Sequence, residues 1–406
     1  MHSLFSSSRG VKAALLGAAT ALAALCGAAA SAAPLTWTQV YDQSVPSTSS
    51  ETLTRSLRGL ALADDDSSIY GGFIQKSLGS GVRQFSLPGG TPGGFYNVNA
   101  SSNGPSSTDH QPKAVATDDR GLVFIGSSKD STSGDNARVI ISSSTLTGTP
   151  TVVVLPDIAS PGSVTSERVN GLSVVTIGGT RYLYTSREHP NSAYVERYVI
   201  GGTDATNTTL TLDLSFNGTG RINIRNSFAG ASDLRGLEVA ADGTIYVTSH
   251  ANDAVYRISS DLSSITRQTV NNAMDLALFD GRVFVTSYNA ASSAIFELMG
   301  TTTLDILSSF DAFGYFPRGL YGNENDTGYS GIDIDANGRI YLADQFYVLR
   351  RGTPGGTNDV SNDRILVSSP LALLGAGGDV PEPAGLALML AGLAALAAVR
   401  RRRAQR

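Results

Sequence analysis

Six copies of one hairpin pattern run through this sequence, and this repetition constrains the fold more than any other feature. Each copy has an apolar strand of alternating character, a short turn rich in Asp and Gly, and a second strand that contains an aromatic residue. The first strands begin at Arg58, Lys113, Asn170, Arg235, Asp275 and Gly331, and the second strands begin at Ser68, Leu122, Tyr182, Ile245, Val283 and Ile340. Alternation around turns such as Asp242-Gly243 predicts β-hairpins, and six of them in one register predict a repeat protein.

Further apolar alternation follows four hairpins and predicts third strands at Tyr194–Val199, Ala254–Ile258, Ala294–Leu298 and Phe346–Arg350. A unit of three or four strands cannot bury both of its faces alone, so the units must stack around an axis. The sequence therefore predicts an all-β fold, a six-bladed β-propeller that occupies residues 33–368. The strand-like segment Leu35–Tyr41 is expected to close the ring beside Arg364–Val367.

Seven blades remain an alternative, because three long insertions have room for further strands. These insertions are Asn99–Gln111, Thr203–Asp233 and Phe310–Tyr329.

The fourth repeat, Arg235–Leu262, resembles the NHL type of propeller repeat. This resemblance implies an architecture and says little about activity. It also implies two enzymatic possibilities, since the NHL-like peptidylamidoglycolate lyases hold zinc with three histidines and the gluconolactonase-like propellers hold a divalent ion. No Gly-Glu-Gly-Pro sequence precedes Leu60, where the gluconolactonase-like propellers have their first metal ligand. A metal-dependent lyase or hydrolase is therefore an alternative function and not the preferred one.

Propeller topology predicts where a ligand would bind. The turn before each innermost strand and the loop after each second strand lie on one face, around the mouth of the central channel. The charged and amide residues expected there are Arg58, Glu188, Arg235, Asn252, Asp253, Asn289, Arg318 and Asp344. The three arginines each precede Gly-Leu, and they could either bind an anion or hydrogen-bond to carbonyl groups between blades.

Metal binding is a possibility at two places. His110, His189 and His250 are all expected at the mouth, where they could bind zinc or be solvated loop residues. Residues Asp333 to Asp344 have the spacing of a calcium-binding loop, but the repeat register puts Asp333 to Asn337 along an extended strand. Four extended residues span about 13 Å, too far for one ion, so the turn is preferred.

The end of the chain carries a targeting signal. Val380, Pro381, Glu382 and Pro383 precede the apolar run Ala384–Val399, and Arg400, Arg401, Arg402 and Arg403 follow it. Sixteen helical residues extend about 24 Å, close to the thickness of a bilayer, and the arginines would stay on the cytoplasmic side. This order of features resembles the PEP-CTERM sorting tail, which an exosortase recognises and removes. Such tails are also classed as ice-binding protein C-terminal domains, and an ordinary membrane anchor is the alternative.

The start of the chain agrees with export. Arg9 and Lys12 precede an apolar segment, and Ala30-Ser31-Ala32 suits cleavage by signal peptidase. The sequence thus predicts a signal peptide at 1–32, the propeller at 33–368, a Gly-rich linker at 369–380 and a sorting tail with one transmembrane helix at 381–406. Cys26, the one cysteine, lies in the signal peptide, so no disulfide is expected in the mature protein.

Charge narrows the choice of partners. The net charge falls from −5 to −12 when processing removes Arg9, Lys12, Arg400–Arg403 and Arg406 and Glu382 stays behind. An acidic protein repels nucleic acid, and no Gly-x-Ser-x-Gly motif supports serine hydrolase chemistry. The resemblance to PEP-CTERM proteins implies a cell-surface or matrix protein associated with exopolysaccharide and biofilm. Exosortase and signal peptidase are its expected processing partners.

Overall fold

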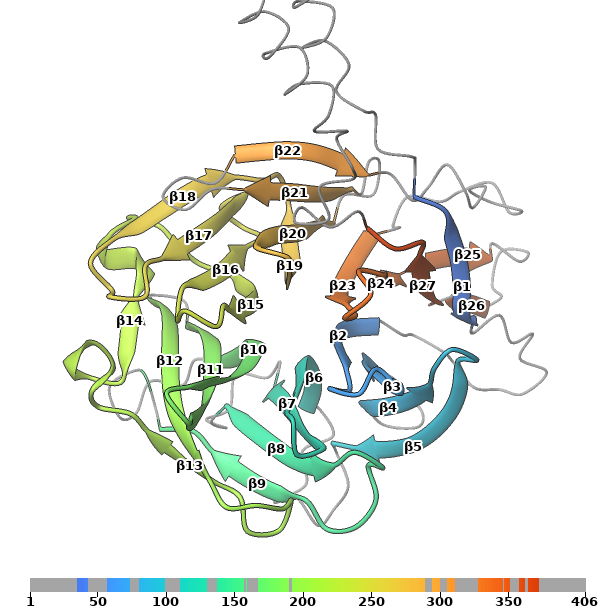
Figure 1. The fold of residues 1–406 in the computed structure, drawn as a ribbon, viewed down its shortest axis with the longest axis horizontal. Helices are drawn as coiled ribbons and strands as arrows, with labels where there is room; N and C mark the ends of the chain where they lie inside the picture. The colour runs from blue at the N-terminus through green and yellow to red at the C-terminus, as the bar shows by residue number, and fades with distance from the viewer. Residues whose placement is uncertain are drawn as a thin grey trace, which may run out of the picture. The chain divides into compact units, whose positions relative to one another are not determined.

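The computed structural model describes residues 35–42, 57–73, 80–98, 110–129, 137–156, 158, 167–189, 192–288, 294–299, 305–310, 328–345, 347–350, 358–361 and 364–371. Within these residues, six antiparallel sheets stand around a central channel (Figure 1), and each sheet forms one blade. The six-bladed propeller predicted from the repeats is confirmed, and the long insertions do not add a seventh blade to the described part of the ring.

The first three blades follow one another along the chain. Blade one contains β2 (Leu57–Leu62), β3 (Ser68–Phe73), β4 (Gly81–Ser86) and β5 (Thr91–Asn97). Blade two contains β6 (His110–Thr117), β7 (Leu122–Lys129), β8 (Arg138–Ser143) and β9 (Thr151–Val154). Blade three contains β10 (Arg168–Ile177), β11 (Thr180–His189), β12 (Ser192–Gly201) and β13 (Thr209–Leu212), and β14 (Arg221–Asn223) also pairs with β12. Two short 3₁₀ helices flank β14, η2 (Phe216–Gly218) and η3 (Ile224–Asn226).

The other three blades complete the ring. Blade four contains β15 (Leu234–Val239), β16 (Ile245–Ser249), β17 (Ala254–Ile258) and β18 (Ile265–Thr269). Blade five contains β19 (Ala273–Phe279), β20 (Arg282–Ser287), β21 (Ile295–Met299) and β22 (Asp305–Phe310). Blade six contains β23 (Gly328–Ile334), β24 (Ile340–Gln345), β27 (Arg364–Ser368) and β1 (Trp37–Asp42).

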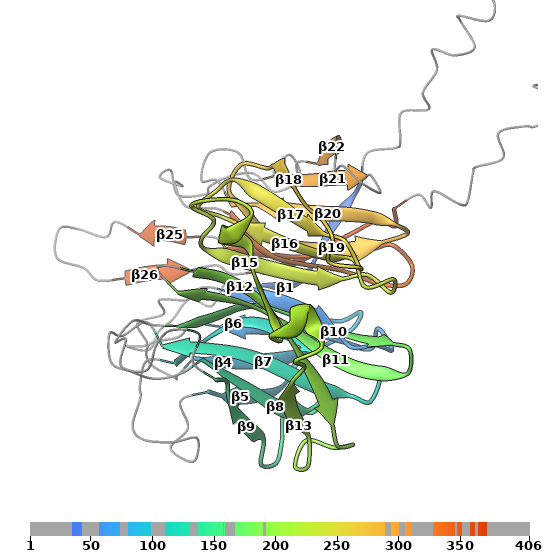
Figure 2. The same ribbon diagram turned by 90° about the vertical axis from the view of Figure 1, so that its left-hand side faces the viewer.

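Blade six joins the two ends of the propeller. The first strand of the chain, β1, pairs with β27, and Trp37 lies opposite Ser368. This pairing confirms the ring closure predicted between Leu35–Tyr41 and Arg364–Val367. One predicted third strand is wrong, however, because β25 (Tyr347–Arg350) pairs with β26 (Asn358–Ser361) in a separate hairpin and β27 pairs with β24 instead. That hairpin projects beyond the blades on one side in Figure 2.

The innermost strands share one register. At their third position all six carry an apolar side chain: Leu60, Val115, Leu172, Leu237, Leu276 and Ile332. At the fourth position each residue lies opposite an aromatic residue of the second strand, in the pairs Ala61–Tyr70, Ala116–Phe124, Ser173–Tyr184, Glu238–Tyr246, Ala277–Phe284 and Asp333–Tyr341. The core therefore lies between the faces of neighbouring blades, as in the cluster that joins Tyr184 and Val195 of blade three to Leu237 and Val247 of blade four.

The predicted targeting segments lie outside the described residues. This applies to the signal peptide at 1–32, to almost all of the linker at 369–380 and to the sorting tail at 381–406. Among the residues that the structure describes, no helix is long and apolar enough to cross a membrane.

Candidate functional site

The mouth of the channel is formed by the first position of the six innermost strands. Every one of these strands has a β-bulge here, a feature that turns side chains out of the regular alternation. The first-position residues that line the channel are Arg58, Lys113, Asn170, Arg235, Met274 and Ser330. Three of the six are cationic, and they come from blades one, two and four.

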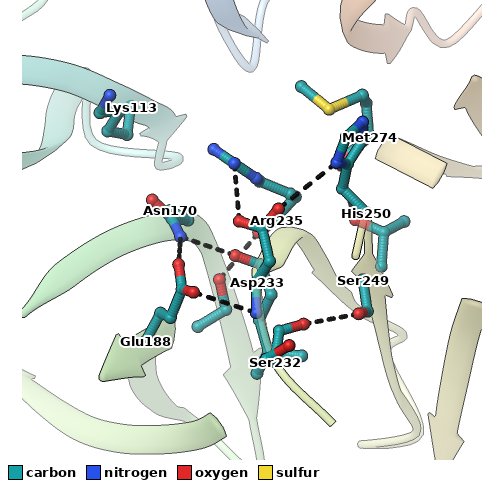
Figure 3. Close-up of polar contacts among 12 residues, drawn as sticks. Lys113, Asn170, Glu188, Ser232, Asp233, Arg235, Ser249, His250 and Met274 are labelled. Atoms are coloured by element: carbon teal, nitrogen blue, oxygen red, sulfur yellow. Dashed lines mark hydrogen bonds and ion pairs between the residues drawn. The ribbon is translucent and has the colours of Figure 1, made fainter. Parts of the chain in front are cut away.

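Asp233 connects the groups at the mouth on blade four (Figure 3). It lies one residue before β15 with a positive φ of 48°, a backbone conformation that Asp tolerates better than most residues. Its Oδ1 lies 2.6 Å from Arg235 Nη2, and its Oδ2 lies 3.4 Å from His250 Nδ1. Burial raises the pKa of Asp233, but the hydrogen bond from His250 and the charge of Arg235 outweigh burial and hold the pKa at about 2. Asp233 is therefore ionised at neutral pH.

Blade three holds this loop in place from the side. Glu188 Oε1 accepts a hydrogen bond from the backbone N–H of Asp233 at 3.2 Å. Asn170 Nδ2 donates to Glu188 Oε2 at 3.1 Å and to the carbonyl of Leu234 at 2.8 Å. Burial and the negative charge of Asp233 raise the pKa of Glu188. Two neighbouring carboxyl groups at the mouth thus have opposite pKa shifts, and one of them, Asp233, contacts His250.

Asn252 and Asp253, predicted at the mouth, bind to the backbone of neighbouring loops. Asn252 Oδ1 accepts from the N–H of Ser232 at 2.8 Å, and its Nδ2 donates to the carbonyl of Gly230 at 3.2 Å. Asp253 Oδ1 accepts from the N–H of Asn272 at 2.6 Å. Asn252 therefore fixes the loop that carries Asp233, and Asp253 fixes the segment that precedes β19.

The three histidines lie at or next to the ends of strands. His110 begins β6, His189 ends β11, and His250 follows β16. His110 is buried, with Nδ1 3.2 Å from Ser127 Oγ, whereas His250 is one-third exposed and lies beside Asp233. The side chain of His189 is outside the described part of the structure, so the three-histidine zinc site stays a prediction.

The remaining predicted mouth residues have other surroundings. Asp344 is buried in blade six, where its Oδ2 lies 2.7 Å from Arg364 Nε. Asn289, Arg318 and the sorting residues Val380–Pro383 and Arg400–Arg403 lie outside the described residues. Ser330 and not Arg318 occupies the first position of blade six.

The calcium-like spacing forms the preferred turn, but the strand that was predicted to extend to Asn337 ends at Ile334. β23 continues to Ile334, and Asp335 then accepts backbone hydrogen bonds from Asn337 and Arg339 at 3.0 and 2.8 Å. Within the described residues, no group of three or more His, Cys, Asp or Glu side chains is arranged to hold a metal ion.

Below the mouth, the channel is nearly filled. The cavity between the innermost strands has a volume of about 30 Å³, room for two or three water molecules. Asp275 is the one acidic residue at the second position, where four blades have Gly and one has Ala, and Glu238 and Asp333 are the acidic residues at the fourth. A ligand larger than a few waters must bind at an end of the channel.

Sequence reasoning missed Lys113, Asn170 and Asp233 as mouth residues. The signal for the first two was present, because Lys113 and Asn170 stand in the repeats where Arg58 and Arg235 stand. Asp233 has no counterpart in the repeat pattern, and only the loop geometry brings it to Arg235 and His250.

Comparison with known proteins identifies the sorting tail. The PEP-CTERM protein-sorting motif matches residues 379–403. No curated protein matches the chain. A periplasmic gluconolactonase from Pseudomonas aeruginosa is a similar structure, with a TM-score of 0.46 and 13% identity over 78% of this chain and 88% of the other. A catalytically inactive virginiamycin B lyase from Staphylococcus aureus with quinupristin has a TM-score of 0.43 and 11% identity over 83% of this chain and 100% of the other.

Scores at this level transfer no activity to this chain. The sorting motif is the more informative match, because the Pro-Glu-Pro triplet, the apolar run and the arginine cluster occur in this sequence in the order that the motif requires. The protein is thus a six-bladed β-propeller with a PEP-CTERM sorting motif, which implies a surface protein sorted by an exosortase.

Proposed function

We propose that the propeller is a surface binding module whose mouth holds the carboxylate groups of an extracellular polysaccharide. The observation that supports this proposal is the cationic group Arg58, Lys113 and Arg235, which shares one register position on three blades and lines the channel opening. Arginine offers paired donors that match a carboxylate, and lysine adds a compact positive charge.

Two other first-position residues make hydrogen bonds between blades. Asn170 donates to the carbonyl of Leu234 on the next blade, and Ser330 donates to the carbonyl of Leu57. Arg235 instead pairs with Asp233, and its Nε is buried without a hydrogen-bond partner among the described residues. An unsatisfied buried donor costs about 1–3 kcal/mol, which an anionic ligand would recover.

The overall negative charge of the mature protein limits which polyanions can bind. A polymer with dense phosphate charge would be repelled over its whole length. A polysaccharide with isolated carboxylates can present one group at a time to the mouth. Since the channel below holds only a few waters, the polymer would lie across the opening and not enter it.

Binding of polygalacturonate and of neutral dextran to the full chain tests this proposal. We expect polygalacturonate to bind and dextran not to bind, with an affinity that falls as salt is added. Arg235→Gln and Lys113→Gln should each weaken binding about tenfold. Arg120→Gln, at a hairpin turn on the opposite face, is the matched control and should have no effect. Equal binding of both polymers, or wild-type affinity in both mouth variants, would contradict the proposal.

A metal-dependent or acid–base enzyme at the mouth is the second candidate, and the pair of His250 and Asp233 favours it. A carboxylate at Nδ1 orients the imidazole and leaves Nε2 to accept a proton. Metal analysis of the full chain by mass spectrometry, with His189→Ala and His250→Ala, separates the two functions. Stoichiometric zinc that both variants lose would favour the enzyme, whereas metal content that neither substitution changes would favour the binding module.

A further inference from the structure

A second cavity opens on the face opposite the mouth, between blades four and five. Its volume is about 450 Å³, within the range of small-molecule sites, and far larger than the channel interior. The hairpin turns that follow β15 and β19 form its rim, at Val239 to Ala241 and Phe279 to Gly281. We call this space the turn-side cavity. The mouth and the turn-side cavity are separate, since the filled channel lies between them.

The walls of the turn-side cavity combine aromatic rings with carboxyl groups. Tyr246 and Phe279 are half-buried and supply the rings. Glu238 and Asp333 supply the carboxyl groups from the fourth position of their strands, and Asp280 lies at the rim. Glu238 lies directly opposite Tyr246 in the pairing of β15 with β16.

Tyr246 differs from its counterparts in other blades. Four blades have a tyrosine at this place in the second strand, and three of the hydroxyl groups bind within the protein. Tyr70 donates to the carbonyl of Ser144 at 2.8 Å, Tyr184 accepts from Arg197, and Tyr341 lies 3.4 Å from Asp335 Oδ2. Among the described residues, Tyr246 has no such bond, so its hydroxyl group can bind a ligand in the turn-side cavity.

The one cationic residue in the lining is already neutralised. Arg282 Nη1 lies 3.0 Å from Glu297 Oε1, and both side chains are buried. The guanidinium also lies over the rings of Phe279 and Phe284, at 5.8 and 5.3 Å. The other titratable groups of the lining, Glu238, Asp333 and Asp280, are carboxyl groups. Glu238 Oε2 accepts a hydrogen bond from Ser173 Oγ at 2.8 Å, and Asp333 accepts from the backbone N–H groups of Leu62 and Ile334 at 2.7 Å each, so a cationic ligand would share these carboxyl groups with the protein.

We propose that the turn-side cavity binds an amino sugar with a free ammonium group, as in a de-N-acetylated polysaccharide. The sugar ring would pack its C–H face on Tyr246 and Phe279, and the ammonium group would lie between the carboxyl groups of Glu238 and Asp333. The hydroxyl groups of the sugar have partners in Tyr246 and in Asp280 at the rim. A saccharide carrier for the ammonium group follows from the surface location that the sorting motif implies.

Electrostatics favours a cation at this place over a neutral group. Burial and the charge of Asp333 raise the pKa of Glu238 well above its usual range, and burial raises the pKa of Asp333 to about 6. A positive charge beside both groups would relieve their repulsion and favour their ionised forms. Two carboxyl groups are too few for calcium, which takes six to eight oxygen ligands.

Titration calorimetry of the full chain with two tetrasaccharides tests the proposal. One is the tetramer of glucosamine, and the other is its fully N-acetylated form, which has the same ring without the charge. We expect the glucosamine tetramer to bind at least tenfold more tightly at pH 7. Equal affinities for the two probes would overturn the proposal.

Variants locate the binding. Glu238→Gln should reduce the ratio of the affinities for the glucosamine and N-acetylated tetramers to less than threefold. Tyr246→Phe, which removes only the hydroxyl group, should weaken the binding of both tetramers about threefold. Asp261→Asn is the matched control, because it removes one carboxylate from an exposed turn outside the cavity. An equal loss in Asp261→Asn and Glu238→Gln would show general charge attraction and would overturn the site.

Arg235→Gln distinguishes this site from the mouth. Retained glucosamine binding in a variant that has lost polygalacturonate binding supports two separate sites. Failure of polygalacturonate to bind would refute the function of the mouth and leave this proposal standing. Loss of both ligands in Arg235→Gln would refute the separation of the two sites, and with it the turn-side cavity as the place of binding.

Discussion

Asp275 should make the stability of the propeller depend on pH near neutrality. Its carboxyl group lies in the channel wall and accepts hydrogen bonds from the N–H groups of Leu276 and Ile332, so it connects blade five to blade six. Burial raises its pKa from 3.8 to about 7. The folded state therefore binds this proton more tightly than the unfolded state. The stabilisation is complete below about pH 4 and is lost as the pH rises through 7.

The size of the effect follows from the pKa difference. A difference of about 3 corresponds to about 4 kcal/mol in total. Only about two of these three pH units lie between pH 5 and pH 7, so we expect about 2 kcal/mol less stability at pH 7 than at pH 5. Asp333, with a pKa of about 6, acts in the same direction. Asp233, with a pKa of about 2, is ionised throughout this range and does not oppose the trend.

Urea unfolding at pH 5, 6, 7 and 8 at constant ionic strength measures this effect. Asp275→Asn cannot titrate and keeps one acceptor oxygen, so it should cost about 1 kcal/mol at pH 5. The variant should then lose less stability than the wild type between pH 5 and 7, by about 2 kcal/mol. Asp261→Asn, whose carboxyl group has a lowered pKa of about 2, should leave the slope unchanged. Equal slopes for the wild type and Asp275→Asn would refute the reasoning.

Three further predictions concern the packing of the blades. Asp118→Ala leaves the buried Arg181 without its ion-pair partner and should lower the free energy of unfolding by about 3–5 kcal/mol, and a loss below 1 kcal/mol would contradict a buried pair. Gly171→Ala puts a methyl group against the carbonyl of Arg235 on the next blade and should lower the free energy of unfolding by about 1–3 kcal/mol, measured by thermal unfolding. An unchanged midpoint would show that the two blades can move apart at no cost. Trp37, the one tryptophan, is buried in β1, so its fluorescence should be blue-shifted and should change at the same urea midpoint as the far-UV circular dichroism. An earlier change would show that β1 does not close the ring cooperatively.

Local patterns made most of the ring predictable, and long-range pairing limited the rest. The alternation in Leu237–Val239 and its counterparts arises because one face of each strand is buried, and this local pattern is visible in the sequence. Phe346–Arg350 also alternates and does form a strand, but its sequence does not state which strand it pairs with. β27 is the third strand of blade six instead, where it pairs with β24 on one side and with β1 on the other.

The candidate site was less predictable, because side-chain partners depend on loop geometry. Asp344 was expected at the mouth, yet the structure places it inside β24 and buries it against Arg364, a residue twenty positions later. Asn252 was expected to contact a ligand, and it binds the loop backbone at Ser232 and Gly230 instead. Residue type and face could be predicted from topology, whereas the direction of each side chain could not.

The differences between the repeats indicate where a ligand binds. At the third position all six blades need the same apolar side chain, because it packs between blades. At the first and fourth positions the backbone geometry is equally conserved among the blades, but the residues range from Arg to Met and from Ala to Glu. Packing cannot require Arg in one blade and Ser in another at the same place. The cations of the first position and the carboxyl groups of the fourth are therefore the places where the blades differ most in charge. They lie toward the two ends of the channel, where a ligand has room.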